Sequence, residues 1–367
     1  MKILWFTWKD LSNPLSGGAE LVDFKIAERL VKRGHEVKFI TSGFYKAKPR
    51  EFINGFEIIR VGNYLSVYFE AFIEYHRNWK NWADVVIEEI NTVPFFTQFY
   101  VKEKRFLLIY QLCREIWFYQ SVFPISLFGF LIEPIYLFFL RKNKVITESK
   151  STKCDLQKYG FNAEDISIIP MASNISPIVS LNNNRKYKEL TLLSIGSIRS
   201  MKRTLIQIKA FELSKKTIAS LKMIVAGSYE NNYGLKVKKY IENSIYKKDI
   251  LFLGKIDESK KMDLMSKSHL IVVSSVKEGW CLVVTEAAAQ GTPAVVCNSD
   301  GLKDSVIDGS TGLISKDSTP YELSLKIVEL ISDPVKYWQF SKKAWTEAKK
   351  MSYDATCSEF FKIIKQQ

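Results

Sequence analysis

Two carboxylates, Glu278 and Glu286, stand eight residues apart in the segment Glu-Gly-Trp-Cys-Leu-Val-Val-Thr-Glu-Ala. A carboxylate accepts two hydrogen bonds side by side, which suits the neighbouring hydroxyl groups of a sugar. The residues between the two glutamates are expected to enter a helix, whose free N–H groups and positive dipole end suit a phosphate. One short segment can therefore hold both ends of a nucleotide sugar.

The elements around this segment predict where it lies in a fold. Apolar residues 270–273 before it and 294–297 after it indicate two buried strands. Residues 283–290 between them favour a helix, which Gly291 would end. The order strand, loop, helix, strand puts Glu278 at the carboxyl end of a strand, where open α/β sheets bind their ligands.

The segment resembles the Glu-x7-Glu motif of the retaining glycosyltransferases of family four, the glycosyl transferases group 1, which have the GT-B fold. The likeness includes Gly-Trp after the first Glu, Ala after the second, and Gly-Thr-Pro before the next strand. It implies that Glu286 binds the donor ribose, and that Glu278 contacts the donor sugar or flanks the transferring carbon. The backbone expected to line the sugar and phosphate is that of Gly279, Trp280, Cys281, Leu282 and Val283.

A cationic loop, Gly196 to Arg203, follows the first predicted strand of the second half. In the family pattern an Arg comes directly after this Gly and a Lys five residues later, and both neutralise the donor diphosphate. Lys202 matches the Lys, but Ser197 stands at the Arg position, with Arg199 as the nearest substitute. Cations at a helix start oppose the helix dipole, and an anionic ligand would relieve that conflict. We therefore expect Gly196, Arg199 and Lys202 to bind the diphosphate.

Three further loops carry glycines at predicted strand ends. Gly17 and Gly18 follow the first strand, and adjacent glycines let the backbone approach a ligand and expose N–H groups to a phosphate. The family has a similar Gly-Gly-Ala-Glu there, facing the donor diphosphate and the acceptor. By the same resemblance, the loops that contain Gly227 and Lys255 border the nucleobase.

The histidine that many family members carry has no counterpart in this chain. It stands at the end of a first-domain strand near the reacting carbon. Here the matching strand is expected at residues 106–112, and Tyr110 or Gln111 occupies the place of the histidine. His35, His76 and His269 lie elsewhere and are not expected to be catalytic. The family mechanism needs no strong protein base if the leaving phosphate takes the acceptor proton. The expected catalytic residues are Glu278, Lys202, Tyr110 and Gln111.

Neither a metal nor a cofactor is expected besides the donor substrate. Metal-dependent nucleotide-sugar enzymes hold the cation with an Asp-x-Asp motif, which the sequence lacks. The five cysteines are scattered without a Cys-x-x-Cys pair, which indicates neither a zinc site nor a disulfide framework. Cysteine use of this kind favours a reducing, cytoplasmic environment.

Strand and helix patterns alternate along most of the chain, which predicts an α/β protein with doubly wound parallel sheets. A polar stretch at 171–188, with the run Asn182 to Arg185, is the expected linker. The GT-B resemblance implies two Rossmann-like domains facing across a cleft, with C-terminal helices that cross back to the first domain. The predicted domains are 1–175 on the acceptor side, 186–350 on the donor side, and 351–367 as the returning helix.

The net charge of +14 points to an anionic partner, unless it is only a solvated basic surface. No helix-turn-helix, zinc-finger or RNP motif appears, so nucleic acid ranks below anionic lipid and a diphosphate substrate. Residues 117–119 and 123–140 are aromatic and apolar, and Arg141, Lys142 and Lys144 follow them. This pattern suits either a membrane interface or a helix packed under the sheet, and it is too interrupted to span a membrane.

These observations predict a retaining, metal-independent transferase that moves a hexose from a nucleoside diphosphate sugar to a glycan or lipid-linked acceptor. We expect it in the cytoplasm, with peripheral contact to the inner face of the membrane as an option. A nucleotide-sugar epimerase of similar shape and a non-catalytic nucleotide-sugar binder are the alternatives. The epimerase would need a His in the cleft. Ser197 and the replacement of the family histidine favour the binder, whereas Glu278, Glu286 and Lys202 argue against it. No Gly-x-Gly-x-x-Gly fingerprint follows a strand, which argues against a dinucleotide-dependent dehydrogenase.

Overall fold

The computed structural model describes residues 1–181 and 185–366. These residues divide into two compact units. Unit 1 comprises Met1–Met171 and Tyr353–Gln367, and unit 2 comprises Ala172–Ser352. The asparagines 182–184 of the expected linker lie outside the described residues.

Unit 1 is built on a sheet of mostly parallel strands. Its strands are β1 (Lys2–Phe6), β2 (Glu36–Ser42), β3 (Arg50–Ile53), β4 (Phe56–Val61), β5 (Val85–Glu89), β6 (Lys104–Leu108), β7 (Val145–Thr147) and β8 (Ile166–Ile168). They lie in the order β3-β4-β2-β1-β5-β6-β7-β8, and only the β3–β4 pair is antiparallel among these described strands. The chain extends the sheet to one side from β1 and to the other from β5. Ligands of such sheets bind beside the loops at that reversal.

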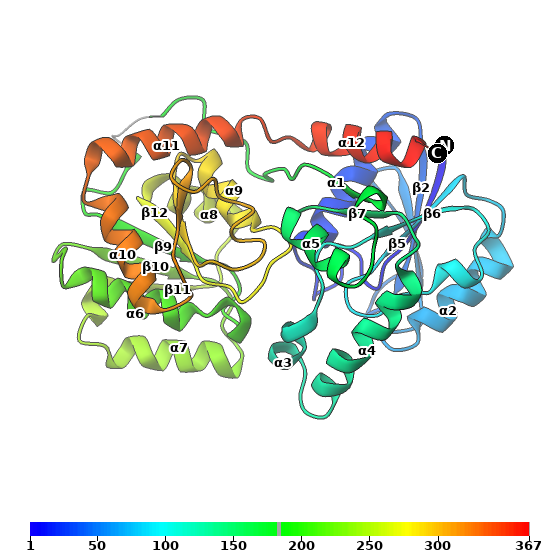
Figure 1. The fold of residues 1–367 in the computed structure, drawn as a ribbon, viewed down its shortest axis with the longest axis horizontal. Coiled ribbons are helices and arrows are strands. Elements are labelled where there is room, and N and C mark those ends of the chain that lie inside the picture. Colours follow the sequence, from blue (N-terminus) through cyan, green and yellow to red (C-terminus); the bar gives the residue numbers. More distant parts are fainter. Residues whose placement is uncertain (182–184, 367) are drawn as a thin grey trace. The chain divides into compact units, whose positions relative to one another are not determined.

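The helices of unit 1 cover both faces of this sheet. They are α1 (Gly18–Lys32), α2 (Val67–Glu74), α3 (Trp117–Gln120), α4 (Ile125–Leu140), α5 (Lys150–Lys158) and α12 (Tyr353–Lys365). α12 lies against α1, where Arg29 Nε is 2.8 Å from a carboxylate oxygen of Asp354 (Figure 1). Its Phe360 ring stacks on Trp5 of β1 with ring centroids 5.3 Å apart, so the C-terminal helix completes the core of unit 1.

Unit 2 has a sheet in which all described neighbours are parallel. Its strands are β9 (Thr191–Ile195), β10 (Lys222–Ala226), β11 (Ile250–Gly254), β12 (Leu270–Val273), β13 (Ala294–Val296) and β14 (Gly312–Ile314). Their order is β11-β10-β9-β12-β13-β14, so the reversal falls between β9 and β12. The loops after these two strands therefore flank the expected ligand crevice.

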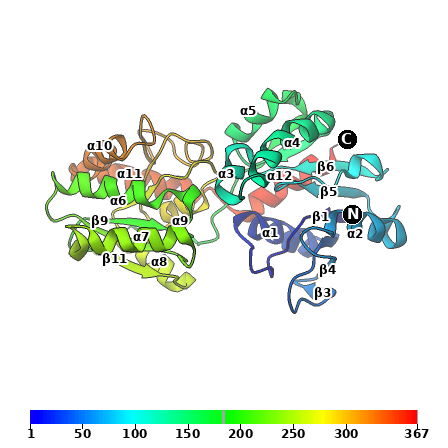
Figure 2. The same cartoon turned by 90° about the horizontal axis from the view of Figure 1, so that it is seen from below.

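Helices lie on both sides of the second sheet as well. They are α6 (Thr204–Lys215), α7 (Asn232–Asn243), α8 (Glu258–Lys267), α9 (Leu282–Ala289), α10 (Pro320–Ile331) and α11 (Pro334–Ala348). α11 runs along one side of the sheet and α7 along the other (Figure 1), and Figure 2 shows the same layers from below. The predicted α/β class with doubly wound sheets is confirmed in each unit. Within the described residues, no helix is both long and apolar enough to cross a membrane.

The largest difference from the predicted elements concerns the strand expected at 106–112. β6 ends at Leu108, and the amide of Ile109 makes one further bond to Ile146 O. The next carbonyl, that of Tyr110, accepts a hydrogen bond from Thr152 Oγ1 of α5 instead of a strand amide. The chain then turns, with Arg114 at φ 43°, so its pairing along the sheet stops.

Candidate functional site

The site in unit 2 is a pocket at the point where the strand order reverses. It has a volume of about 180 Å³ and is lined by both loops that flank the reversal, after β9 and after β12. Six of the residues predicted from the sequence line it together: Gly196, Arg199, Lys202, Glu278, Cys281 and Val283.

Close approaches between glycines shape one border of this pocket. Gly196 has φ 132° and Gly227 has φ 152°, and a Cβ at Gly227 would lie 1.8 Å from Gly196 O. Gly196 N donates to Ala226 O, and Gly227 N donates to Gly254 O. The loops after β9, β10 and β11 are therefore tied together through backbone that only glycine permits. Of the residues predicted near the nucleobase, Gly227 lies in this border, and exposed Lys255 comes directly after Gly254.

Backbone and side-chain bonds hold Lys202 in place. It ends a 3-10 turn, and Arg203 follows with a left-handed φ of 52°. Ser274 Oγ, after β12, lies 3.1 Å from Lys202 O and 3.0 Å from Arg203 O. Val276 N donates to Met201 O over 2.8 Å. The loop that carries Lys202 is thus joined to the loop that carries Glu278.

The charged groups of the pocket comprise one ion pair and one unpaired cation. Lys202 Nζ forms an ion pair with a carboxylate oxygen of Glu278, and both side chains remain partly exposed. The Arg199 side chain is exposed, and its guanidinium makes no hydrogen bond or ion pair with any residue that the structure describes. Ser197, at the position where the family pattern has an Arg, bonds to the Ser228 hydroxyl over 3.2 Å. Arg199 is therefore available to a ligand, whereas Ser197 adds no charge.

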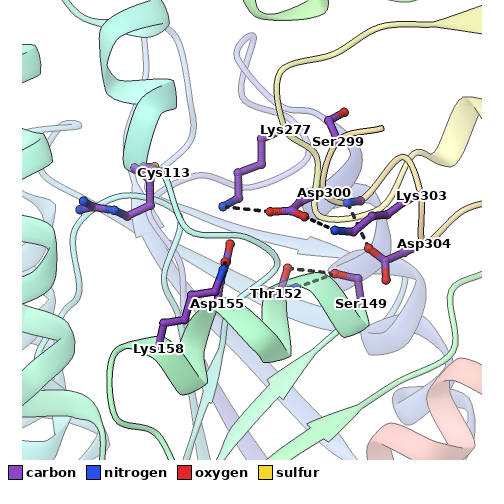
Figure 3. Close-up of polar contacts among 12 residues, drawn as sticks. Cys113, Ser149, Thr152, Asp155, Lys158, Lys277, Ser299, Asp300, Lys303 and Asp304 are labelled. Atoms are coloured by element: carbon purple, nitrogen blue, oxygen red, sulfur yellow. Dashed lines mark hydrogen bonds and ion pairs between the residues drawn. The ribbon is translucent and has the colours of Figure 1, made fainter. Parts of the chain in front are cut away.

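The Glu278 loop is held from its other side by the segment after β13, which the sequence reasoning missed. Glu278 N donates to Asp300 O over 3.0 Å. Asp300 also lies between two lysines, 3.9 Å from buried Lys277 Nζ and 2.7 Å from Lys303 Nζ (Figure 3). A Cβ at Gly301, with φ 77°, would lie 2.1 Å from Glu278 O. The signal in the sequence was the Asp-Gly pair at 300–301, typical of a tight turn.

Glu286 does not line this pocket with Glu278. It lies in α9, is buried, and has a carboxylate oxygen 2.8 Å from Lys261 Nζ of α8. Burial raises the pKa of the Glu286 carboxyl above its usual value, and Lys261 opposes that shift. Lys261 was not predicted. The sequence nevertheless contains a signal for the start of α8, the N-cap residue Asp257, whose side chain accepts a hydrogen bond from Lys260 N.

The residues between the two glutamates have local roles. Trp280 folds onto α9, where its Nε1 donates to Thr285 Oγ1 over 2.8 Å. Gly279 is buried, and Leu282 begins α9. Burial raises the pKa of the Cys281 thiol to about 12, so this side chain is a neutral part of the pocket wall.

The predicted residues of unit 1 gather at the reversal of the first sheet. Gly17 and Gly18 begin α1, and Gly17 N donates to Glu20 Oε2 over 2.6 Å. Tyr110 is buried and donates its hydroxyl to Asp23 of α1. Gln111 Oε1 is buried without a hydrogen-bond partner among the described residues.

A cluster of buried acids lies at the same place in unit 1. Asp23 and Glu89 hydrogen-bond each other, and both are about 1% exposed. Burial, followed by the nearby charge of Glu20, raises the pKa of Glu89 to about 7. Burial and Glu89 raise the pKa of Asp23 as well. Lys9 Nζ stands 3.2 Å from Glu20 Oε1 and offsets part of this negative charge.

Two doubly wound units, one with a pocket of cations and a carboxylate at its strand-order reversal, define a protein of the GT-B fold. Solved structures agree over the full length of the chain. A sucrose-phosphate synthase from Thermosynechococcus elongatus matches with a TM-score of 0.79 and 17% identity, over 100% of this chain and 98% of its own. HepE from Anabaena, in complex with UDP and glucose, matches with a TM-score of 0.74 and 18% identity, over 100% of each chain.

The sequence of unit 2 resembles a known family of transferases. Residues 180–349, which contain the pocket, match the family model described as "Glycosyl transferases group 1". An uncharacterised glycosyltransferase of Methanocaldococcus jannaschii is 30% identical over 206 residues, which are 54% of this chain and 51% of the relative. A second one from the same organism is 24% identical over 96% of this chain and 94% of its own length. The resemblance to the group 1 glycosyltransferases is thereby confirmed.

The relatives are matched over unequal shares of their length. A poly(glycerol-phosphate) alpha-glucosyltransferase of Bacillus subtilis is 30% identical over 48% of this chain, but only 26% of that protein is covered. This chain therefore spans about half the length of the first Methanocaldococcus relative and about a quarter of the length of the Bacillus relative.

Proposed function

We propose that the protein is a retaining, metal-independent glycosyltransferase that moves a hexose from a nucleoside diphosphate sugar to a glycan or a lipid-linked acceptor. The observation that carries the proposal is the Lys202–Glu278 pair beside unpaired Arg199, in a pocket at the strand-order reversal. A sugar with a diphosphate needs a carboxylate for its hydroxyls and cations for its phosphates, and both are present.

The cations would act on the leaving group. Breaking the bond between the sugar and the diphosphate puts negative charge on a phosphate oxygen, and preorganised positive groups stabilise such a transition state. Lys202 and Arg199 supply that charge in place of a metal ion. When Lys202 turns to the phosphate, the Glu278 carboxylate is released to accept hydrogen bonds from the sugar.

Retention of configuration requires the acceptor to attack from the face that the diphosphate leaves. The leaving phosphate oxygen then takes the proton from the acceptor hydroxyl, so no strong protein base is needed. The thiol that lines the pocket is neutral, which fits this role of the phosphate. Glu286 and Lys261, one helical turn beyond the pocket, would bind the ribose hydroxyls together, with the carboxylate accepting and the ammonium donating.

The nature of the donor is supported by what the similar proteins are named for. HepE was solved with UDP and glucose, and the relative from Bacillus subtilis is an alpha-glucosyltransferase. We therefore place a uridine diphosphate hexose first among the donors.

The test is a thermal-shift panel with UDP, GDP, ADP and their sugar conjugates, with and without EDTA. A donor at about 100 times its Kd stabilises the protein that binds it by ~2.7 kcal/mol. We expect one nucleotide series to raise the Tm, in EDTA as well, and the rise to be lost in Lys202→Ala and Glu286→Ala. Lys216→Ala removes an exposed lysine at the end of α6 and should keep the rise. No shift with any nucleotide would contradict the donor site, and a shift that needs a divalent metal would contradict metal independence.

A further inference from the structure

α4 exposes an apolar face to solvent. Phe128 is 67% exposed and Leu131 is 58% exposed, and Ile135, Phe138 and Phe139 are each more than half exposed. Their spacing of three or four residues places them along one side of the helix. α4 lies on the outside of unit 1 in Figure 1 and Figure 2. Water-soluble proteins rarely leave so continuous an apolar surface uncovered, so this face requires a partner.

The outward turn of this face follows from the polar groups on the opposite side of α4. Glu133, the only charged residue of the helix, is buried and accepts hydrogen bonds from Cys113 N at 2.7 Å and Arg114 N at 2.6 Å. Trp117 Nε1 donates to the same carboxylate over 3.2 Å. Gly129 leaves room for the Trp117 ring, since a Cβ there would lie 2.4 Å from it. A rotation of α4 that buried its phenylalanines would leave the Glu133 carboxylate without these partners.

The apolar surface continues beyond both ends of the helix. Val122 and Phe123, just before α4, are each more than 70% exposed. At the other end, Phe139 O accepts a hydrogen bond from Gln98 Nε2, and the neighbouring Phe99 is 68% exposed. The surface therefore extends over more than the length of one helix, and bulky aromatic side chains dominate it.

Positive charge borders this surface, and negative charge is missing from it. The Arg141 guanidinium stacks on the Phe138 ring at 4.0 Å, and exposed Lys142 follows. Between residues 116 and 147 the only acidic residue is buried Glu133. Aromatic side chains beside basic ones suit the boundary between lipid headgroups and acyl chains.

We propose that this α4 face docks the protein on an anionic lipid bilayer. The 16 residues of α4 are fewer than the roughly 20 needed to span the hydrocarbon core, so the helix lies in the plane of the interface. Anionic headgroups supply the negative charge that Arg141 and Lys142 lack nearby. A second copy of the same face would bring cations without acidic counterparts.

Docking on a membrane also narrows the acceptor, a point that rests on the proposed transferase function. A protein held at the bilayer by unit 1 meets acceptors that are themselves carried on lipid. The acceptor class that fits is therefore a sugar or glycan on a lipid anchor.

The experiment is flotation of the full chain with phosphatidylcholine vesicles, with and without 30% phosphatidylglycerol (a mole fraction chosen to mimic an anionic membrane). The wild type should float with the anionic vesicles, and Phe128→Glu/Leu131→Glu should bind at least about tenfold less, because two apolar side chains no longer enter the interface. The matched control is Tyr321→Glu/Val335→Glu, which introduces the same two negative charges at exposed apolar residues of unit 2. This variant should still float.

Three results would overturn the proposal. The first is a wild type that does not float with the anionic vesicles. The second is an equal loss of vesicle binding in the control variant. The third is a wild type that sediments as a dimer without lipid and that Phe128→Glu/Leu131→Glu makes monomeric. The thermal shift with nucleotide should be unchanged in this double variant. If docking failed while nucleotide still raised the Tm, the proposed donor site would be unaffected. The two proposals can therefore be rejected separately.

Discussion

Asp23 of α1 and Glu89 of β5 place two carboxyl groups in hydrogen-bond contact inside unit 1. Two carboxylates cannot bond to each other unless a proton lies between them, and burial favours the neutral form of each. Tyr110, which replaces the expected histidine, donates its hydroxyl to Asp23 and is therefore occupied within the protein. At this residue scale, the place of the family histidine holds a structural hydrogen bond.

The shared proton makes the stability of unit 1 dependent on pH. Burial raises the pKa of folded Glu89 to about 7, above the 4.5 of the unfolded chain, so the folded state holds more protons between these values. Its contribution to stability is therefore greatest at low pH and is lost as the pH rises from about 4.5 through about 7. Glu89→Gln replaces the proton with a permanent N–H donor. The Tm of Glu89→Gln minus that of the wild type should increase between pH 5 and pH 8, by at least about 2 °C.

The check for this prediction is a series of melting curves across that pH range. Glu103→Gln changes a carboxyl that accepts from Tyr75 near the surface, and it serves as a charge-matched control. A difference in Tm that stays flat with pH in Glu89→Gln would show that the pair holds no proton.

The glycine-lined loops after β9, β10 and β11 act as one element, because each approaches the next too closely for a side chain. Gly227 is central, since its amide bonds to Gly254 O and its α-carbon faces Gly196 O. Close backbone contact leaves the loop that carries Arg199 and Lys202 little freedom, which keeps the cations over the pocket. The geometry of the site thus depends on residues that carry no charge.

Gly227→Ala should destabilise unit 2 by about 3 kcal/mol or more, since the new Cβ meets backbone that cannot move aside. It should also abolish the nucleotide-induced thermal shift. Gly309→Ala is the matched control, because Gly309 has a φ of 71° but nothing within 4 Å of an added Cβ. That substitution should cost only the backbone strain, roughly 1 kcal/mol. Equal losses in a denaturant titration would show that strain and not the close approach governs the loop.

Pocket residues could be predicted from the sequence where a residue of suitable type follows the end of a predicted strand, as do Lys202, Glu278 and Gly196. Contacts that depend on packing could not be predicted. Lys261 of α8 forms an ion pair with Glu286, but the polar sequence of α8 does not indicate which side of this helix faces α9. For a similar reason, the sequence does not determine the orientation of α4. Apolar periodicity alone would place its phenylalanines inward, whereas the hydrogen bonds of Glu133 turn them outward.

At the scale of the whole molecule, the chain builds two units and returns to the first one with α12. Phe360 is fully buried against Trp5, so the C-terminal helix is part of the core that the N-terminal strand begins. The polar contacts of Arg29 with Asp354 hold the same pair of elements together at the surface. The stability of unit 1 therefore depends on a helix that follows unit 2 in the sequence.

Phe360→Ala should destabilise unit 1 by roughly 3–5 kcal/mol and leave unit 2 unchanged. Hydrogen exchange read by mass spectrometry separates the two, because β1 and β2 should lose protection while β9 and β12 keep it. Lys362→Ala alters an exposed part of the same helix and should change neither unit. Loss of protection in both units at once would mean that they unfold together.

The return of α12 also has a consequence for biosynthesis. Arg29 and Asp354 are 325 residues apart in the chain. At 5–20 residues per second, roughly 15–65 s pass on the ribosome between the synthesis of α1 and that of its partner. Unit 2 can close during this interval, while the Trp5 surface of unit 1 stays uncovered in the cell. The unit that is made first is thus the one that is finished last.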